Sequence, residues 1–296
     1  MSGTKLGFMG LGEMGFGMAV NMQKGEPDFM ILSSSQQKRE HFAALGAAVA
    51  DDLSELGQND VIFLCLPGGK EVEQAIFGEG GMLPQLKSGS IIVDFSTISY
   101  TTATEICERL AQKGIIFLDC PISGMKKRAD DGTLTVMCGG DQAAFQRVKP
   151  YLDKVGNKVL YMGQSGQGQL AKLINQLLFD INLAAIAEIL PMAAKMGVDC
   201  EKITQVINSG TGRSYASEFF IPRILEGSFE DGYSLKNAYK DLQSASQISA
   251  EQAIPMPVLA AATATYQSAL QKGFGEDNKG GMIKVFEQLL GVEFRK

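Results

Sequence analysis

A lysine and an asparagine near the middle of the chain have the spacing of a proton-transfer site. Lys172 and Asn175 are three residues apart, and together with Gly168 they fall on one face of a predicted helix. Leucine and isoleucine surround this polar face, so Lys172 would be substantially buried. Burial lowers the pKa of a lysine toward the range useful for acid and base catalysis. A lysine that only reaches from a helix end into water is the alternative interpretation.

Other catalytic chemistries lack the residues that they need. The chain of 296 residues has one histidine, His41, and five cysteines without a CxxC pair. Serine–histidine triads and zinc hydrolases both depend on histidine, so we expect neither mechanism and no metal. An odd number of widely spaced cysteines argues against a disulfide framework and fits a cytoplasmic protein.

A glycine-rich segment close to the N-terminus has the pattern of a dinucleotide site. It reads Gly10, Leu11, Gly12, Glu13, Met14 and Gly15, between a predicted strand and a predicted helix. The first glycine would allow a tight turn, the second would let the backbone approach a pyrophosphate, and the third would let helix and strand pack closely. The free N–H groups of the helix N-terminus would bind the phosphates. A glycine-rich turn without a ligand is the alternative.

The residues after the second predicted strand bear on the choice of cofactor. An NAD site is expected to carry an acidic residue here, but the chain has Ser33 and Ser34, followed by Lys38. Hydroxyls and a cation would accommodate a 2′-phosphate, so NADP is favoured over NAD. The alternative is that Ser35 caps the next helix and that the cations are solvated.

A third segment, Ser123, Gly124 and Met125, follows another predicted strand. A serine hydroxyl and successive backbone N–H groups would form an anion site suited to a substrate carboxylate. On residue types alone, an ordinary turn is the favoured interpretation. The cations of residues 126–128 would either be solvated or bind a second anionic group.

Short apolar runs, several of them continuous, predict a mainly parallel sheet covered on both faces. The predicted strands are residues 5–9, 29–32, 61–65, 91–95, 115–118, 133–138 and 158–162. From about Gly166 the apolar residues recur at helical spacing, and Gly168 to Met196 predicts one long helix that Pro191 would kink or divide. We therefore expect an α/β Rossmann domain over residues 1–164 and an all-α domain over 165–296, joined by this helix.

Charge and hydropathy exclude two classes of partner. The net charge is −6 and the isoelectric point is about 5.0, so no global field attracts nucleic acid. Polar residues interrupt the longest apolar stretch, Leu177 to Met196, so we expect no membrane span. We expect a small-molecule substrate instead.

Taken together, the motifs resemble those of the β-hydroxyacid dehydrogenase family, along essentially the whole chain. The matching segments are residues 10–15, Leu66-Pro67, residues 94–97, residues 119–124, residues 132–135, residues 166–175 and residues 240–242. The resemblance implies hydride transfer between a nicotinamide cofactor and a small carboxylate-bearing hydroxy acid or aldehyde. It implies that Lys172 moves the proton, that Asn175 positions the substrate and that Ser123 and Gly124 hold its carboxylate. Leu66, Pro67, Thr97 and Lys240 would lie by the cofactor, and the protein would form a dimer or tetramer.

Three positions depart from the family pattern. In the family, glycine often follows the segment that holds the carboxylate, but this chain has Met125. Its side chain is expected to reshape the substrate pocket. Ser33 to Ser35 replace the Asn-Arg-Thr triplet common in NADP-preferring relatives, and Gln176 replaces a second asparagine. Two other functions stay open: an imine reductase, and a cofactor-binding sensor or scaffold without catalysis.

Overall fold

The computed structural model describes residues 3–296, which form two compact units. The first ends at Lys172, and the second runs from Leu173 to Lys296. The division falls inside one long helix, α8 (Gln167–Lys195). Each unit has a hydrophobic core of its own and is described by itself.

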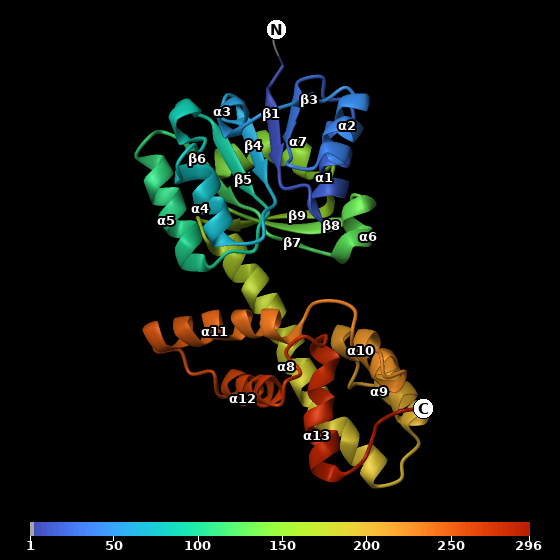
Figure 1. The fold of residues 1–296 in the computed structure, drawn as a ribbon. Coiled ribbons are helices and arrows are strands. Elements are labelled where there is room, and N and C mark those ends of the chain that lie inside the picture. The colour runs from blue at the N-terminus through green and yellow to red at the C-terminus, as the bar shows by residue number, and fades with distance from the viewer. Residues whose placement is uncertain (1–2) are drawn as a thin grey trace. The chain divides into compact units, whose positions relative to one another are not determined.

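The first unit is built on a nine-stranded, mainly parallel sheet (Figure 1). Its strands are β1 (Leu6–Met9), β2 (Phe29–Leu32), β3 (Ala48–Val49), β4 (Val61–Leu64), β5 (Ile91–Asp94), β6 (Ile116–Asp119), β7 (Ile122–Ser123), β8 (Leu134–Gly139) and β9 (Gly156–Gly163). The strand order is β3-β2-β1-β4-β5-β6-β8-β7, and β9 pairs with β8. Strand β8 runs antiparallel to β6 and β7, whereas the pairs formed among β1 to β6 are all parallel. The predicted Rossmann sheet is therefore confirmed.

Helices cover both faces of this sheet. They are α1 (Gly15–Gln23), α2 (Gln36–Ala44), α3 (Leu53–Leu56), α4 (Gly69–Phe77), α5 (Tyr100–Ala111), α6 (Met125–Asp130) and α7 (Gln142–Leu152), with a 3₁₀ turn, η1 (Leu83–Gln85). One core lies under α1, α2 and α7 and contains the stacked rings of Phe8, Phe63 and Phe95. The other lies under α3, α4 and α5. Strands buried on both faces explain why their sequences are continuously apolar rather than alternating.

The sheet topology places a crevice at the carboxyl end of β1. The chain leaves β1 toward β2 and β3 and then returns to β4 on the other side of β1. Connections that leave in opposite directions open a gap above the strand ends, which is where open α/β sheets bind ligands. The glycine-rich segment follows β1 directly and so lies at this crevice.

The second unit is helical apart from an isolated bridge between Ser234 and Asn278. After α8 come α9 (Cys200–Ser209), α10 (Tyr215–Leu225), α11 (Leu235–Glu251), α12 (Pro257–Gln271), the 3₁₀ turn η2 (Lys279–Met282) and α13 (Ile283–Leu290). Its core includes an ion pair of Lys279 with Asp180, and Tyr266 donates a hydrogen bond to the same carboxylate. This unit confirms the predicted all-α second half.

Helix α8 is not divided at Pro191, which excludes one of the two predicted effects of this proline, while the kink stays a prediction. The helix is a single element of 29 residues that includes the proline. A proline in a helix loses one backbone hydrogen bond. Ala187 and Leu190, before the proline, are buried in the core of the second unit, and Ala193 and Ala194, after it, are partly buried against the same core. Packing of both halves on one core outweighs the lost bond.

The length and composition of α8 are those of a membrane span and equally those of a core helix, so the expectation of no membrane span stays a prediction. Of the described residues, only this helix is long and apolar enough to do so. Its most apolar window is 39% buried inside the protein. The helix is thus a core element that also leaves much apolar surface uncovered.

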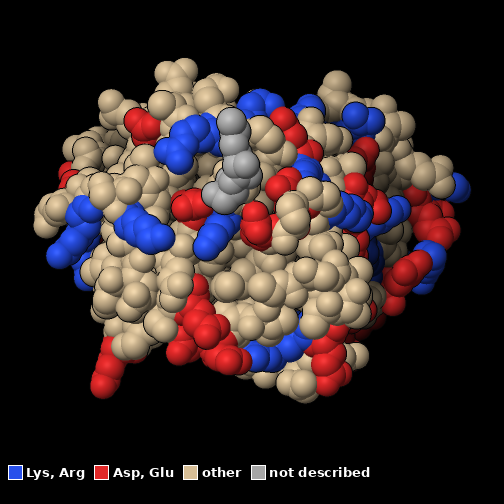
Figure 2. All heavy atoms as spheres, turned by 90° about the horizontal axis from the view of Figure 1, so that it is seen from above, with Lys and Arg blue, Asp and Glu red and all other residues tan. Residues whose placement is uncertain are grey.

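Charges of both signs are mixed on the molecular surface that faces the viewer in Figure 2. Lys and Arg alternate there with Asp and Glu and with uncharged atoms. The described residues of that face therefore form no extended patch of one sign.

Candidate functional site

The loop after β1 needs glycine at its first and last glycine positions for steric reasons. Gly10 has φ +100, and a Cβ there would lie 2.1 Å from the carbonyl oxygen of Cys65. A Cβ on Gly15 would lie 1.9 Å from the carbonyl oxygen of Gly10. The end of β1, the end of β4 and the start of α1 therefore pack backbone against backbone.

The middle glycine has a different environment. A Cβ on Gly12 would meet no atom within 4 Å, and Gly12 and Glu13 are exposed. Open space above this loop, next to the N-terminus of α1, fits the approach of a pyrophosphate to backbone N–H groups. The loop from Gly10 to Gly15 thus has the form that a dinucleotide requires.

Lys38 is held beside this loop. Its ammonium group donates a hydrogen bond to the carbonyl oxygen of Leu11. Ser33 follows β2 on the same edge of the sheet, and its hydroxyl accepts a hydrogen bond from the backbone N–H of Ser35 at 3.2 Å. Arg39 points elsewhere, because it pairs with Asp51 at 2.7 Å. Of the two predicted cations after β2, only Lys38 contacts the glycine-rich loop.

The residues after β4 and β5 are joined by Ser96. Its hydroxyl accepts a hydrogen bond from the backbone N–H of Leu66 at 2.8 Å. Pro67 and Thr97, the next residues along their loops, are both exposed. The two predicted cofactor segments therefore lie side by side at the carboxyl edge of the sheet.

Gln169 connects this edge to the start of α8. Its side-chain amide donates to the carbonyl oxygen of Ser96 at 2.8 Å and accepts from the N–H of Ile98 at 3.2 Å. Gln169 is 2% exposed. These two bonds hold the backbone on both sides of Thr97.

Asp119, at the end of β6, binds the first turn of the same helix. Its carboxylate accepts hydrogen bonds from the N–H of Gly166 at 2.8 Å and of Gln169 at 2.9 Å. Burial raises the pKa of Asp119 to about 6, although the backbone N–H groups of Gly166 and Gln169 partly oppose this rise. A Cβ on Gly168 would lie 2.4 Å from the carbonyl oxygen of Met137, so α8 starts in direct contact with the strand ends.

A second buried carboxyl group lies one strand away. Burial raises the pKa of Asp94 to about 7, while hydrogen bonds from Ser96 lower it in part. One oxygen of Asp94 accepts from the N–H of Ser96 at 2.9 Å, and the other has no hydrogen-bond partner among the described residues. Because burial favours the neutral acid, Asp94 stabilises the fold most at low pH, and this contribution is lost as the pH rises through about 7.

The sequence predicts that three further residues act on the substrate or lie by the cofactor. These residues, Lys172, Asn175 and Lys240, occupy different places in the structure. Lys172 is half-buried on α8, one turn beyond Gln169, and Asn175 is exposed on the next turn of the same helix. Lys240 is exposed on α11 in the second unit. The approach of Asn175 and Lys240 to substrate or cofactor stays a prediction.

The segment Ser123 to Met125 forms a sharp turn between β7 and α6. Gly124 has φ +150 and Met125 has φ +61. The backbone of Met125, a residue with a side chain, therefore adopts the left-handed conformation. This conformation costs a non-glycine residue about 1 kcal/mol.

The side-chain amide of Asn21 on α1 donates to the carbonyl oxygens of Ala129 and Asp130. Helix α6 therefore packs on the helix that follows the glycine-rich loop.

The cations after this turn have local partners. Lys126 pairs with Asp130 at 2.6 Å, and this carboxylate raises the pKa of Lys126, with a smaller contribution from Glu13. Arg128 donates to the carbonyl oxygen of Thr133. Two of the three cations thus hold α6 and β8 in place.

Ser96, Asp119 and Gln169 were given no role in the sequence analysis. The contacts described above that join them to other segments connect residues 30 to 73 positions apart, so local patterns cannot reveal them. A usable signal was a polar residue, Gln169, beside glycine in the first turn of an otherwise apolar helix. Within the described residues, no cluster of His, Cys, Asp or Glu is arranged to hold a metal.

We expect Gln169→Ala to lower the free energy of unfolding by about 2 to 4 kcal/mol. The substitution leaves two buried backbone groups, on Ser96 and Ile98, without partners, and each costs about 1 to 3 kcal/mol. Urea denaturation measures the change. The exposed neighbour Gln167 provides the matched control, since Gln167→Ala is expected to stay within about 0.5 kcal/mol of the native protein. Equal effects of the two variants would contradict the bridging role.

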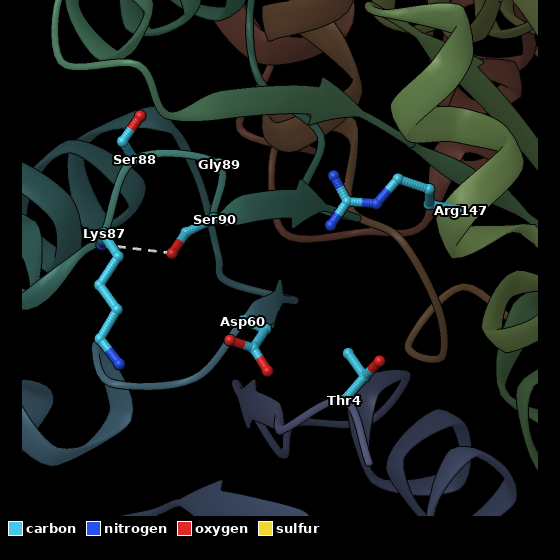
Figure 3. Close-up of a pocket in the computed structure, with 7 residues that line it drawn as sticks. All are labelled: Thr4, Asp60, Lys87, Ser88, Gly89, Ser90 and Arg147. Atoms are coloured by element: carbon cyan, nitrogen blue, oxygen red, sulfur yellow. Dashed lines mark hydrogen bonds between the residues drawn. The ribbon is translucent and has the colours of Figure 1, made fainter. Parts of the chain in front are cut away.

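A cavity of about 420 Å³ lies at the opposite edge of the sheet (Figure 3). It is lined by Thr4, Asp60, Lys87, Ser88, Gly89, Ser90 and Arg147. Thr4, Asp60 and Ser90 precede β1, β4 and β5, so the cavity is at the amino ends of these strands. It is therefore separate from the crevice at the carboxyl ends.

Two family models match the chain, one for each part. Residues 5–163 match the NAD-binding domain of 6-phosphogluconate dehydrogenase. Residues 166–286 match the model described as the NAD-binding domain of NADP-dependent 3-hydroxyisobutyrate dehydrogenase. The first match ends within β9 and the second begins at the start of α8.

Characterised relatives match over nearly the full length. The 2-(hydroxymethyl)glutarate dehydrogenase of Eubacterium barkeri is 34% identical over 97% of this chain and 96% of its own. The 2-hydroxy-3-oxopropionate reductase of Escherichia coli K12 is 30% identical over 96% of this chain and 97% of its own. The crystal structure of 3-hydroxyisobutyrate dehydrogenase from Salmonella typhimurium superposes with a TM-score of 0.83 and 30% identity, and the match covers 96% of this chain and 100% of that one.

Proposed function

Because the chain belongs to the 3-hydroxyisobutyrate dehydrogenase-like family and is an NAD(P)-dependent hydroxyacid dehydrogenase, we propose that it interconverts a small carboxylated aldehyde and the corresponding β-hydroxy acid. In this proposal NADPH is the preferred cofactor and Lys172 moves the proton. The names of its relatives, a hydroxymethyl acid dehydrogenase and an oxopropionate reductase, support this substrate class.

One observation carries the proposal. The first turn of α8 is hydrogen bonded to the carboxyl ends of β5 and β6 through Gln169 and Asp119. The glycine-rich loop opens at this same edge of the sheet. Lys172 follows Gln169 by one helical turn, so its position is fixed relative to the cofactor loops by buried hydrogen bonds.

A bound nicotinamide would supply or accept the hydride, and the protein would correspondingly supply or accept the proton. In reduction, the ammonium of Lys172 donates a proton to the oxygen of the carbonyl as it becomes an alkoxide. In oxidation, neutral Lys172 accepts the hydroxyl proton. We assign to Asn175, three residues further along the helix, a hydrogen bond to the same oxygen. A positioned acid or base of this kind contributes about 10²- to 10⁴-fold to the rate.

The turn at Ser123 to Met125 is assigned to the substrate carboxylate. Two successive residues with positive φ turn the backbone sharply, and a hydroxyl stands beside them on Ser123. Neighbouring backbone N–H groups in such turns form concave sites for anions. A left-handed conformation kept at Met125 despite its cost is typical of functional positions.

The cofactor preference follows from the charge after β2. We expect Ser33→Asp to shift the ratio of kcat/KM for NADPH over NADH about 100-fold toward NADH. The new carboxylate would repel a 2′-phosphate and accept a hydrogen bond from a free ribose hydroxyl. Steady-state kinetics with both cofactors measures the ratio. Lys38→Ala, which removes the cation beside Leu11, is expected to weaken NADPH alone; an equal loss with NADH would contradict the 2′-phosphate assignment.

The five cysteines are free thiols in the structure. This supports our proposal that the enzyme works in the cytoplasm, where thiols stay reduced. We further propose that it acts as a homo-oligomer.

A panel of small aldehydes tests the proposed reaction. Each is offered with NADPH and then NADH, and oxidation of the cofactor is followed by absorbance. We expect turnover of aldehydes with a carboxylate and little turnover of their neutral esters. A preference for sulfonated or phosphorylated aldehydes would replace the carboxylate assignment. Activity on cyclic imines, or tight NADPH binding without any turnover, would overturn the proposed reaction.

A further inference from the structure

The cavity at the amino ends of β1, β4 and β5 is lined by two cations, Lys87 and Arg147, and by one carboxylate, Asp60. Within residues 3–296, the ammonium of Lys87 and the guanidinium of Arg147 form no ion pair and no hydrogen bond. Two cations and one carboxylate give the lining a net charge of +1. Concave surfaces with an excess of one charge attract ligands of the opposite charge.

The two cations reach the cavity from different elements. Arg147 lies on α7, whereas Lys87 lies in the turn before β5. Figure 3 shows their side chains on opposite sides of the cavity, with the carboxylate of Asp60 between them in this view. The cavity, of about 420 Å³, has the volume of a site for a small organic molecule. A molecule that binds both cations therefore needs an anionic group at each end.

Hydrogen bonds hold the turn that carries Lys87. Its N–H donates to the hydroxyl of Ser90 at 3.2 Å, and the N–H of Ser90 donates to the carbonyl oxygen of Lys87 at 2.9 Å. Between them Gly89 has φ +87, and its N–H donates to the carbonyl oxygen of Gly114 at 2.8 Å. Ser90 is 5% exposed. This side of the cavity is therefore rigid before any ligand binds, which lowers the entropic cost of binding.

Asp60 is fixed in the same way. Its carboxylate accepts a hydrogen bond from the N–H of Lys5 at 2.9 Å, and its own N–H donates to the carbonyl oxygen of Lys5 at 3.0 Å. The carbonyl oxygen of Asp60 accepts from the N–H of Ile91 at 2.9 Å. One N–H uses only part of the acceptor capacity of a carboxylate. Asp60 can therefore bind a cationic group of a ligand, and it would repel a third anionic group.

The order of charges in the lining specifies the order of charges in the ligand. A cation, a carboxylate and a second cation are matched one by one by an anion, a cation and a second anion. An α-amino acid with an acidic side chain has this order, and its net charge of about −1 at neutral pH balances the lining. The planar guanidinium of Arg147 suits a carboxylate, which it can bind through two parallel hydrogen bonds.

We propose that this cavity binds an acidic amino acid. Arg147 binds its α-carboxylate, Asp60 binds its ammonium group, and Lys87 binds its side-chain carboxylate. The hydroxyl of Ser90 accepts one hydrogen bond from the backbone and has a proton of its own to donate to the ligand. The site lies at the opposite edge of the sheet from the glycine-rich loop, so the inference does not depend on the proposed reaction.

Matched ligands test the assignment of charges. Equilibrium dialysis of the native protein with radiolabelled glutamate, and separately with aspartate, measures binding directly. We expect one site per chain for at least one of the two. Glutamine lacks the second anion, glutarate lacks the ammonium group, and 2-hydroxyglutarate carries a hydroxyl in its place. Each is expected to compete about tenfold less well or worse, because a charged group of the lining loses its partner. Absence of binding at about 10 mM of either amino acid, or equal competition by glutarate or 2-hydroxyglutarate, would overturn the proposal.

Substitutions in the lining test the place of binding. Arg147→Met and Lys87→Met are each expected to raise the dissociation constant of the bound amino acid about tenfold or more. Asp60→Asn keeps an acceptor for the N–H of Lys5 but removes the charge, so the preference for glutamate over glutarate should disappear. Both methionine variants should keep native aldehyde turnover in the absence of amino acid, since neither residue is near the crevice. Ser123→Ala is the control for binding at the substrate turn. A loss with Ser123→Ala equal to that with Arg147→Met, or native affinity in both methionine variants, would contradict the site.

Discussion

Lys172→Ala is expected to lower kcat by about two to four orders of magnitude, the usual loss when a general acid or base is removed. The affinity for NADPH should stay within about threefold. The groups assigned to the cofactor, the glycine-rich loop and Lys38, do not include this side chain, so we expect cofactor binding to be preserved. Stopped-flow single-turnover kinetics and a fluorescence titration with NADPH measure the two quantities separately.

A second variant separates proton transfer from charge alone. Lys172→Arg keeps a cation at this position, but a guanidinium does not give up its proton at ordinary pH. We expect this variant to remain about as slow as Lys172→Ala. Recovery of most of the rate with arginine would mean that the ammonium acts only as a fixed charge. Near-normal turnover of Lys172→Ala would remove this residue from the mechanism.

The parts of the fold that could be predicted were those coded by local patterns. The continuous apolar run 61–65 corresponds to a strand, Val61–Leu64, that is buried on both faces. The two-residue strands β3 and β7 were not predicted, because so short a segment has no periodicity. Of the two effects predicted for Pro191, the division of α8 does not occur, for a related reason. The stabilisation that keeps α8 continuous comes from tertiary packing, which the local sequence does not encode.

The candidate site divides in the same way. The glycine-rich loop, Lys38 and the turn at Ser123 were found from the sequence, because each contains its chemistry within a few residues. The polar network that fixes α8 was not, because its donors and acceptors come from separate strand ends. In the sequence Asp119 directly follows a predicted strand, and only the structure shows that its carboxylate accepts hydrogen bonds from N–H groups at the start of the helix that carries Lys172. Positioning groups of this kind are recognisable only when the distant elements are placed in space.

Two glycines of the same loop are expected to respond differently when each is replaced by alanine. One variant should lose stability, and the other should lose affinity for the cofactor. Gly10→Ala forces a Cβ to within 2.1 Å of the carbonyl oxygen of Cys65, at a φ of +100. We expect it to lower the free energy of unfolding by about 3 kcal/mol or more, since backbone clash and left-handed strain add. Urea denaturation without cofactor measures this loss.

Gly12→Ala meets no protein atom within 4 Å, so its stability is expected to stay within about 1 kcal/mol of the native value. Its methyl group would occupy the space through which a pyrophosphate reaches the backbone. We therefore expect the dissociation constant of NADPH to rise about 100-fold, which corresponds to about 2.7 kcal/mol. A stable Gly12→Ala variant with native affinity would place the pyrophosphate elsewhere. A Gly10→Ala variant of native stability would contradict the close packing of β1 against β4. The two outcomes are independent, because one glycine is required by the fold and the other by the ligand.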